Sequence, residues 1–97
     1  MSTETTIKHN TYFEGKVQSL ALDTENGKAT LGVMLPGQYT FGTSTAEVMT
    51  IISGELNVKL PNGVWEYYYP NESFEIAAKQ SFQVSCENDV AYICHYE

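Results

Sequence analysis

Apolar and polar residues alternate with a period of two along most of this chain, and turn-forming residues interrupt the alternation roughly every eight to twelve positions. The alternation is clearest in residues 28–35, 55–60 and 81–86, where every second residue is apolar. Further strand-like runs are residues 15–22, 38–41, 48–52, 64–69, 73–76 and 90–96. No stretch has the apolar spacing of an amphipathic helix. The pattern therefore predicts an all-β protein built from short antiparallel strands.

The turn residues agree with this prediction. Asn26-Gly27 and Asn62-Gly63 are typical of tight hairpin turns, because both residue types tolerate a positive φ. Gly54 predicts a third turn, and residues 87–89 join the last two strands. A chain of many short strands leaves sheet edges exposed unless the sheet closes on itself. We therefore expect a closed or nearly closed β-barrel.

The length of 97 residues corresponds to one domain with a modest core. Residues 1–11 have no sustained apolar period, so we expect a flexible N-terminal arm followed by a barrel of residues 12–97. No run of about 18 apolar residues could span a membrane, and the first ten residues lack the apolar segment of a secretory signal. These features favour a cytoplasmic protein in which Cys86 and Cys94 are reduced, buried thiols.

Charge narrows the range of partners. Five basic residues, all lysines, stand against twelve acidic ones, which gives a net charge of −7 at pH 7. The chain lacks the basic stripe that nucleic acids and anionic membrane surfaces require, so we expect neither as a partner. One lysine with backbone N–H groups can still hold a single phosphate, although the chain has no arginine to bind it through two parallel hydrogen bonds. Two histidines and no Cys-x-x-Cys pair give poor support to a metal site.

The middle of the chain resembles the first motif of the cupins, which are small jelly-roll barrels. Pro36-Gly37, the aromatic residues that follow, Glu47 and Gly54 carry this resemblance. In cupins two histidines and a glutamate of this motif, and a third histidine later in the chain, bind a metal. Here Phe41, Thr43 and Phe82 stand at the three histidine positions. The resemblance therefore implies a cupin-type jelly-roll β-barrel with no metal and no cofactor.

A second resemblance covers nearly the whole chain. The residues that carry it are Tyr12-Phe13-x-Gly15-Lys16-Val17, Gly32-Val33-Met34, Gly37-x-Tyr39-Thr40-Phe41, Met49-Thr50-x-Ile52-Ser53-Gly54, Leu56-Asn57-Val58 and Tyr92-x-Cys94-x-Tyr96. This series resembles the small pyrimidine/purine nucleoside phosphorylases, a cupin-like family that cleaves many ribonucleosides with phosphate to give ribose 1-phosphate and a free base. His95 stands where members carry arginine. The resemblance implies nucleosides and inorganic phosphate as substrates.

Two residues are candidates for catalysis. Phosphorolysis of an N-glycosidic bond passes through an oxocarbenium-like sugar, which a carboxylate inside the barrel can stabilise. Glu47 is the candidate for this role, and the alternative is an idle residue at the barrel rim. His95 could protonate or hydrogen-bond the leaving base, since a histidine titrates near working pH. A purely structural histidine on an apolar strand is the alternative.

The candidates for substrate binding each have a structural alternative. Lys79 is the best-placed cation for phosphate, or else a solvated loop lysine. Thr43, Ser44 and Thr45 offer hydroxyl and N–H groups to phosphate or sugar, although a plain turn has the same composition. The aromatic residues that could stack on the base, or be ordinary core, are Tyr39, Phe41 and Phe82.

Two further functions remain open beside the enzyme. A cupin without its metal could bind a small sugar or nucleoside without turning it over, and a purely structural dimer would need no interior cavity. Trp65 and an exposed part of residues 67–69 could form the interface of a homodimer, because exposed aromatic patches usually mark contacts.

Overall fold

The structure is a computed structural model that describes residues 6–97. In this part of the chain the strands are β1 (His9–Tyr12), β2 (Val17–Thr24), β3 (Gly27–Met34), β4 (Gly37–Gly42), β5 (Glu47–Ser53), β6 (Leu56–Lys59), β7 (Trp65–Tyr68), β8 (Ser73–Ile76), β9 (Ser81–Cys86) and β10 (Val90–Tyr96). A single 3₁₀ turn, Phe13–Gly15, separates β1 from β2. The predicted all-β class is confirmed, and no described helix is long and apolar enough to cross a membrane.

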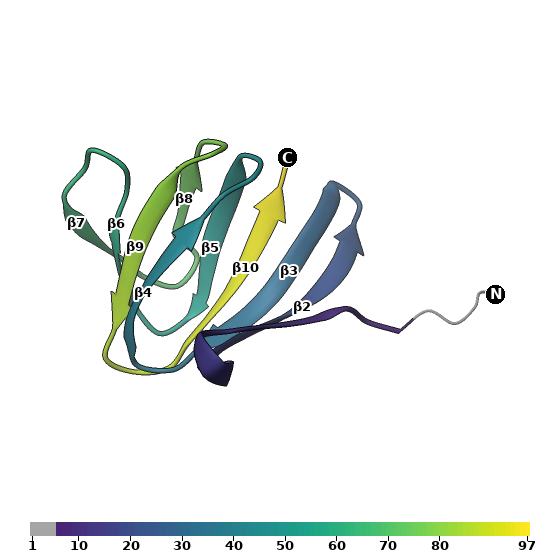
Figure 1. Ribbon diagram of the computed structural model, residues 1–97, viewed down its shortest axis with the longest axis horizontal. Helices are drawn as coiled ribbons and strands as arrows, with labels where there is room; N and C mark the ends of the chain where they lie inside the picture. The colour runs from purple at the N-terminus through teal and green to yellow at the C-terminus, as the bar shows by residue number, and fades with distance from the viewer. Residues whose placement is uncertain (1–5) are drawn as a thin grey trace.

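The strands form two sheets that face each other (Figure 1). The larger sheet has the order β1-β2-β3-β10-β5-β8, and the smaller has the order β4-β9-β6-β7. Within residues 6–97 no strand pairing joins the two sheets, so the expected closed barrel is not confirmed. In Figure 1 the smaller sheet lies on the left, whereas β2 and β3 extend to the right beyond it. One end of the larger sheet is therefore left open on its inner face.

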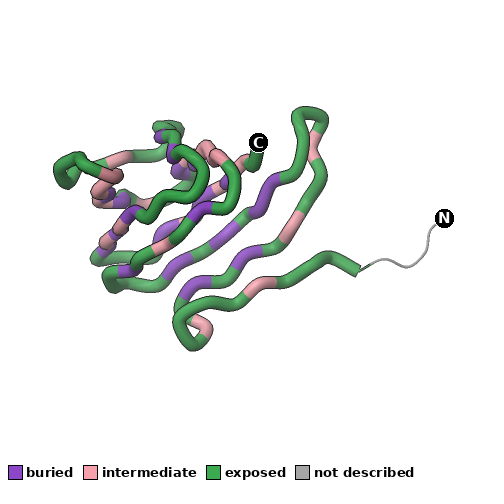
Figure 2. Tube along the Cα trace, turned by 45° about the horizontal axis from the view of Figure 1, so that its top comes forward, coloured by how far each residue is buried: buried purple, intermediate pink, exposed green. Residues whose placement is uncertain are grey.

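The core lies between the two inner faces, and buried residues alternate with exposed ones along the strands (Figure 2). Leu56 and Val58 of β6 and Phe82 and Val84 of β9 are all buried, so the alternation predicted in these two segments is confirmed. Side chains that alternate between a core and solvent are what a two-layer β-sandwich requires. The turns expected at residues 26–27, 54 and 62–63 join β2 to β3, β5 to β6 and β6 to β7.

Strand β3 turns a different set of residues to the core from the one its apolar pattern suggests. Thr30, Gly32 and Met34 face inward and are buried, whereas Leu31 and Val33 are exposed on the outer face. Gly32 pairs with Tyr92 of β10, and a Cβ on Gly32 would lie 2.3 Å from Cζ of the Tyr92 ring. The inner face of β3 therefore provides space for a ring at Gly32 in addition to the apolar side chain of Met34.

The last part of the expected N-terminal arm is a strand. Residues 9–12 form β1 and pair with β2, from His9 opposite Leu20 to Tyr12 opposite Val17. An edge strand forms through backbone hydrogen bonds, so its side chains need not follow an apolar period. Asn10 also donates a side-chain hydrogen bond to Ser19 Oγ at 3.4 Å. Residues 1–5 of the expected arm lie outside the described residues.

We predict that Gly32→Ala destabilises the protein by about 1–3 kcal/mol, the usual cost of overpacking a core. The added methyl group must displace the Tyr92 ring from the core. Gly42→Ala is the matched control, because a Cβ at Gly42 meets nothing closer than 3.9 Å and the residue also lies in a strand. Urea unfolding followed by circular dichroism measures both, and equal stability of the two variants would contradict this account of β3.

Candidate active site

The pairing of β10 with its two neighbours brings four polar side chains together on the inner face. Tyr96 lies opposite Glu47 of β5, and Cys94 lies opposite Thr30 of β3. The Cys94 thiol donates a hydrogen bond to Glu47 Oε1 at 3.3 Å. The hydroxyl oxygens of Thr30 and Tyr96 are 3.0 Å apart and share a hydrogen bond. These four residues, Thr30, Glu47, Cys94 and Tyr96, are called the polar cluster below.

The polar cluster combines one titratable carboxyl with neutral donors. Burial raises the pKa of the Glu47 carboxyl above its ordinary value, and the hydrogen bond from Cys94 partly opposes this rise. Burial, followed by the proximity of Glu47, raises the pKa of the Cys94 thiol far above its ordinary value. Burial also raises the pKa of Tyr96 to about 12. At neutral pH the thiol and the phenol are therefore protonated and can donate hydrogen bonds, and Glu47 Oε1 accepts one from the thiol.

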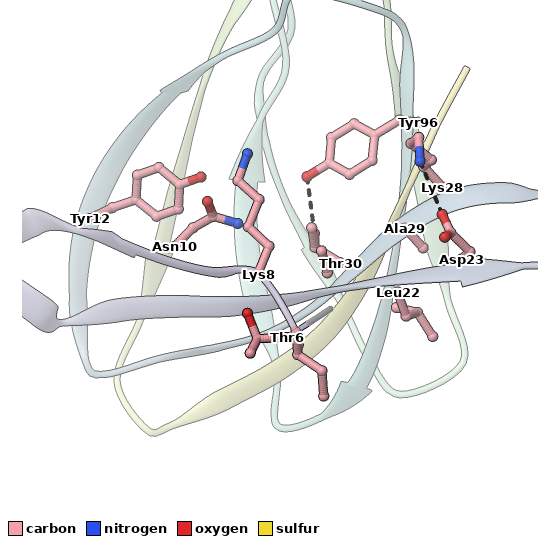
Figure 3. A pocket seen from close by; sticks show the side chains of 12 residues that line it. Thr6, Lys8, Asn10, Tyr12, Leu22, Asp23, Lys28, Ala29, Thr30 and Tyr96 are labelled. Atoms are coloured by element: carbon pink, nitrogen blue, oxygen red, sulfur yellow. Dashed lines mark hydrogen bonds and ion pairs between the residues drawn. The ribbon is translucent and has the colours of Figure 1, made fainter. Parts of the chain in front are cut away.

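A groove of about 750 Å³ extends from the polar cluster across the open end of the larger sheet. Thr30 and Tyr96 line its inner part, and Lys8, Asn10 and Tyr12 line its side (Figure 3). In Figure 3 the Lys8 amine points into the space between the Tyr12 and Tyr96 rings. The residue is held there by the backbone, because the Lys8 carbonyl accepts a hydrogen bond from Ala21 N at 2.9 Å. The groove therefore combines a cation, an amide and hydroxyl groups.

Aromatic residues from both sheets meet on the side of Tyr12. The Phe41 ring lies 6.4 Å from the Tyr12 ring and 5.5 Å from the Phe13 ring, measured between ring centroids. Of the three aromatic residues expected to stack on the base, Tyr39 and Phe82 are buried core residues. The Tyr39 hydroxyl donates to the Leu35 carbonyl at 2.7 Å. Phe41 is only partly buried, so it is the one of the three that a ligand could reach directly.

The residues proposed from the loops lie together at one end of the sandwich. Thr43 is buried, and its hydroxyl donates to the Ala77 carbonyl at 2.7 Å and accepts from Gln80 N at 3.0 Å. Lys79 N donates to the Thr43 carbonyl at 3.0 Å, so the two loops are tied to each other. The Thr43 hydroxyl is thus engaged in the fold, whereas the side chains of Ser44, Thr45 and Lys79 are exposed.

His95 does not join Glu47 in the structure. It pairs with Ala29 of β3 and Val48 of β5, and these residues lie on the outer face of the larger sheet. Glu47 lies on the inner face, beside Tyr96. Because neighbouring residues of a strand point to opposite faces, the two residues proposed for catalysis face opposite sides of one sheet.

Sequence reasoning missed most of the groove. Cys94 and Tyr96 belong to the closing Cys-x-Tyr motif, and their spacing of two predicts a shared face, but no role was expected for them. Lys8 and Asn10 fall in the segment expected to be a flexible arm. Only the pairing of β1 with β2 places them beside the polar cluster. No alternation of apolar residues in this segment predicts that pairing.

The residues at the cupin metal positions do not fit a divalent transition metal. Phe41 and Phe82 offer no ligand atom, and the Thr43 hydroxyl is already bonded to the backbone of the neighbouring loop. Within residues 6–97 no three His, Cys, Asp or Glu side chains gather into a potential metal site. These residues therefore support no metal-dependent step.

Comparison with known proteins identifies the family. A family model described as pyrimidine/purine nucleoside phosphorylase matches residues 7–96. This chain belongs to the pyrimidine/purine nucleoside phosphorylase family. A protein of Alcanivorax borkumensis that carries the same name is 52% identical over 91 residues, which are 93% of this chain and 97% of that protein. The expectation of a nucleoside phosphorylase, and hence of an enzyme, is confirmed.

Solved structures agree with the fold expected of this phosphorylase family. A protein of unknown function from Vibrio parahaemolyticus has a TM-score of 0.90 at 40% identity and covers 96% of this chain and 100% of its own. An RmlC-like cupin from Shewanella frigidimarina has a TM-score of 0.69 at 15% identity, over 94% of this chain and 81% of its own. The second similarity concerns the fold alone and confirms that the fold is cupin-like.

We predict that Cys94→Ala raises the pKa of Glu47 further. The thiol hydrogen bond favours the ionised carboxyl, so its loss leaves the effect of burial unopposed. Cys94→Ser is the control, because a hydroxyl keeps a donor at this position. A carbon-13 NMR titration of the Glu47 carboxyl measures the pKa of Glu47 in the wild type and in both variants. A Glu47 pKa in Cys94→Ala equal to or below that of the wild type would show that the thiol does not stabilise the carboxylate.

Proposed function

We propose that the protein cleaves purine and pyrimidine nucleosides with inorganic phosphate at the inner face of its larger sheet. The C1′–N bond of the nucleoside breaks, a bond forms between C1′ and a phosphate oxygen, and the products are ribose 1-phosphate and the free base. The observation that carries this proposal is the position of Glu47, a half-buried carboxyl that pairs across the strands with Tyr96, which lines the open groove. Family membership supports the reaction type.

Glu47 interacts with the ribose. As the C1′–N bond breaks, positive charge develops on the ribose ring, and a nearby carboxylate lowers the energy of that state. The Cys94 thiol fixes one carboxylate oxygen by its hydrogen bond of 3.3 Å. The other oxygen is free of hydrogen bonds to the described residues and can accept from a ribose hydroxyl. The Thr30–Tyr96 pair supplies further hydroxyl groups beside it.

Lys8 binds the phosphate. Lys8 and Lys28 both line the groove, but the Lys28 amine is paired with Asp23 at 3.1 Å, whereas the Lys8 amine points into the groove with Asn10 and Tyr12 next to it (Figure 3). Since the chain has no arginine, a lysine assisted by neutral donors is the chemistry available for an anion. Lys79 is the alternative cation, in the exposed turn beside Thr43.

Aromatic residues serve the base. Phe41 is partly accessible and packs against Tyr12 and Phe13 at the side of the groove. Stacking on such rings tolerates every base, because each base has a π-face, and this supports a broad specificity for purines and pyrimidines. His95 lies on the other side of the sheet and has no part in this arrangement.

The same proposal covers the conditions and the cellular role of the reaction. The reaction requires no metal and serves nucleoside salvage. It takes place in the cytoplasm, where nucleosides and phosphate are both present. The two cysteines are free and buried, which is consistent with a reducing compartment. The second candidate, a protein that binds a nucleoside or sugar without turnover, is favoured by the absence of arginine near a phosphate site.

The direct experiment incubates purified, chelator-treated protein with uridine or adenosine, with and without phosphate, and follows the products by chromatography. Phosphate-dependent release of uracil or adenine, together with ribose 1-phosphate, is the expected result. Release that needs an added metal would contradict the metal-free mechanism. Nucleoside binding in a calorimeter without any product would select the binding protein instead.

We predict that Glu47→Gln lowers kcat/KM by at least about 100-fold, because the variant loses the charge that faces the developing cation. It should not lose stability at pH 7. Burial raises the folded-state pKa of Glu47, so the wild type loses stability relative to the variant as pH rises from the unfolded-state pKa through the folded-state pKa. A kcat/KM of the variant within a few-fold of the wild-type value would show that Glu47 has no part in the mechanism.

We predict that Lys8→Ala raises KM for phosphate about 10- to 100-fold, the worth of one charge-assisted hydrogen bond. KM for the nucleoside should change little. Lys79→Ala is the comparison, because Lys79 is also an exposed lysine but lies in the β8–β9 turn. Initial-rate kinetics at varied phosphate decide between them. A large increase in KM for phosphate in Lys79→Ala, with no change in Lys8→Ala, would show that phosphate binds at the loops instead.

A further inference from the structure

The outer face of the smaller sheet carries a hollow that is separate from the groove of the larger sheet. Its volume is about 490 Å³, which is within the range of small-molecule sites. The residues that line it come from all four strands of the smaller sheet, and each has a side chain that can form hydrogen bonds. They are Gln38, Asn57, Lys59, Trp65, Gln83 and Ser85. This hollow is called the amide hollow below.

Strand register places the lining side chains in two neighbouring rows across the sheet. One row is Gln38, Ser85 and Asn57, and the other is Gln83, Lys59 and Trp65. Val58 and Val84, which alternate with these residues on β6 and β9, are buried in the core. The side chains of both rows therefore point outward. Trp65 stands at one end of its row, because β7 is the edge strand of this sheet.

The amide hollow contains a polar group that the fold leaves without a partner. Within residues 6–97 the side-chain oxygen of Asn57 is the one buried side-chain nitrogen or oxygen atom that lacks a hydrogen bond. A buried acceptor without a donor costs stability and is uncommon in folded proteins. The last torsion of an asparagine side chain has a broad energy profile, so the amide can turn its oxygen toward a donor in the hollow. Asn57 therefore indicates that this surface binds a ligand.

Two further amides are oriented by each other. Gln38 Nε2 donates a hydrogen bond to Gln83 Oε1 at 3.2 Å. This bond fixes both side chains and leaves Gln38 Oε1 to accept and Gln83 Nε2 to donate toward a ligand. The Ser85 hydroxyl and the Lys59 amine add to these groups, so the hollow offers both donors and acceptors. Hydroxyl groups on a ligand match such a surface, because a hydroxyl can donate and accept.

Trp65 adds an aromatic surface at the end of the hollow. Its side chain is 38% exposed although it is large and mostly apolar. Side chains stand roughly perpendicular to a sheet, so the indole ring rises beside the amides. A flat ring that stacks on the indole turns its edge toward the amides. Stacking on an aromatic side chain suits every nucleobase, and amide side chains bind the donors and acceptors at a base edge in pairs.

The charges around the amide hollow favour a neutral ligand. Lys59 is the one charged residue among the six that line it. Glu55 and Glu87 line a smaller adjoining hollow, which shares Asn57 and Ser85 with the amide hollow. The whole chain has a net charge of −7, so a phosphorylated ligand would meet acidic surroundings with one lysine to balance them. An aromatic base joined to an uncharged sugar meets each of these requirements.

We propose that the amide hollow binds a nucleoside. The base stacks on Trp65, and the ribose hydroxyls form hydrogen bonds with Asn57 and the two glutamines. This is a second nucleoside site, on the opposite sheet from the groove in which we propose that cleavage takes place. In Figure 1, β7 lies at the left end of the molecule, whereas β2 and β3, which contribute to the groove, lie at the right end.

The homodimer interface expected from the sequence would use the same surface. Trp65 and Tyr67 point outward from β7 and are 38% and 56% exposed. The centre of a protein interface is usually depleted of charge and rich in apolar groups. Here Lys59 and Asn57 lie directly beside the two aromatic residues. A small polar ligand fits this surface better than a second copy of the chain.

Tryptophan fluorescence tests the proposal directly, because Trp65 is the only tryptophan of the chain. The intact protein is titrated with adenosine, uridine, ribose or adenosine monophosphate in phosphate-free buffer, in which phosphorolysis cannot proceed. Both nucleosides should change the emission of Trp65 with a saturable dependence on concentration. Ribose should bind more weakly than adenosine, and adenosine monophosphate should bind no more tightly. The absence of a saturable change with either nucleoside would overturn the proposal, and tighter binding of the monophosphate would overturn the assignment of a neutral ligand.

The variant Asn57→Leu separates a binding role from a structural one. It should weaken nucleoside binding, measured by Trp65 emission, at least about 10-fold, because a hydrogen-bond partner of the ligand is lost. Its urea midpoint should equal or exceed that of the wild type, because no unpaired acceptor remains buried. Thr40→Val is the matched control. It removes a polar group from the same face, opposite Gln83, but Thr40 does not line the hollow, so nucleoside binding should be unchanged.

The same variants distinguish this proposal from the proposed function. Asn57 lies outside the groove, so kcat/KM for phosphorolysis should be unchanged in Asn57→Leu. Wild-type nucleoside binding in Asn57→Leu, or a clear loss of stability, would overturn the second site and leave the phosphorylase assignment intact. Trp65 emission that depends on protein concentration alone would indicate a contact between copies and would also contradict it. If Asn57→Leu does not fold, Gln83→Leu provides the same test of binding.

Discussion

The pairing of the last strand, β10, between β3 and β5 is the constraint on which the rest of the structure depends. It joins residues 90–96 to two strands that lie far earlier in the chain, and it sets the row in which each inner side chain sits. Through this register Glu47 meets Tyr96 and Cys94 meets Thr30. A slip of one residue would turn all of β10 over and place His95, rather than Cys94 and Tyr96, beside the carboxyl.

The two faces of the larger sheet differ in their chemical character. The inner face carries the groove and the polar cluster, and the outer face carries exposed aliphatic side chains. Gly32 shows how closely the two are linked, because the space it leaves on the inner face admits the Tyr92 ring while its neighbours Leu31 and Val33 point outward.

Local patterns in the sequence predicted what depends on local chemistry. The alternation in β6 and β9, the hairpin turns and the strand positions follow from residue type and spacing, and the cupin-like motif drew attention to Glu47. Three features escaped because they depend on strand pairing, which the apolar pattern does not encode. These are the inner face of β3, the conversion of the expected arm into β1, which brings Lys8 to the groove, and the separation of His95 from Glu47.

The most direct test of the central claim is a crystal structure of the protein with ribose 1-phosphate bound. We predict that the ribose lies on the inner face of the larger sheet with a hydroxyl within hydrogen-bond distance of Glu47, and that the phosphate contacts the Lys8 amine. A ligand bound at the Lys79 turn or on the outer face, with the groove unoccupied, would contradict the account.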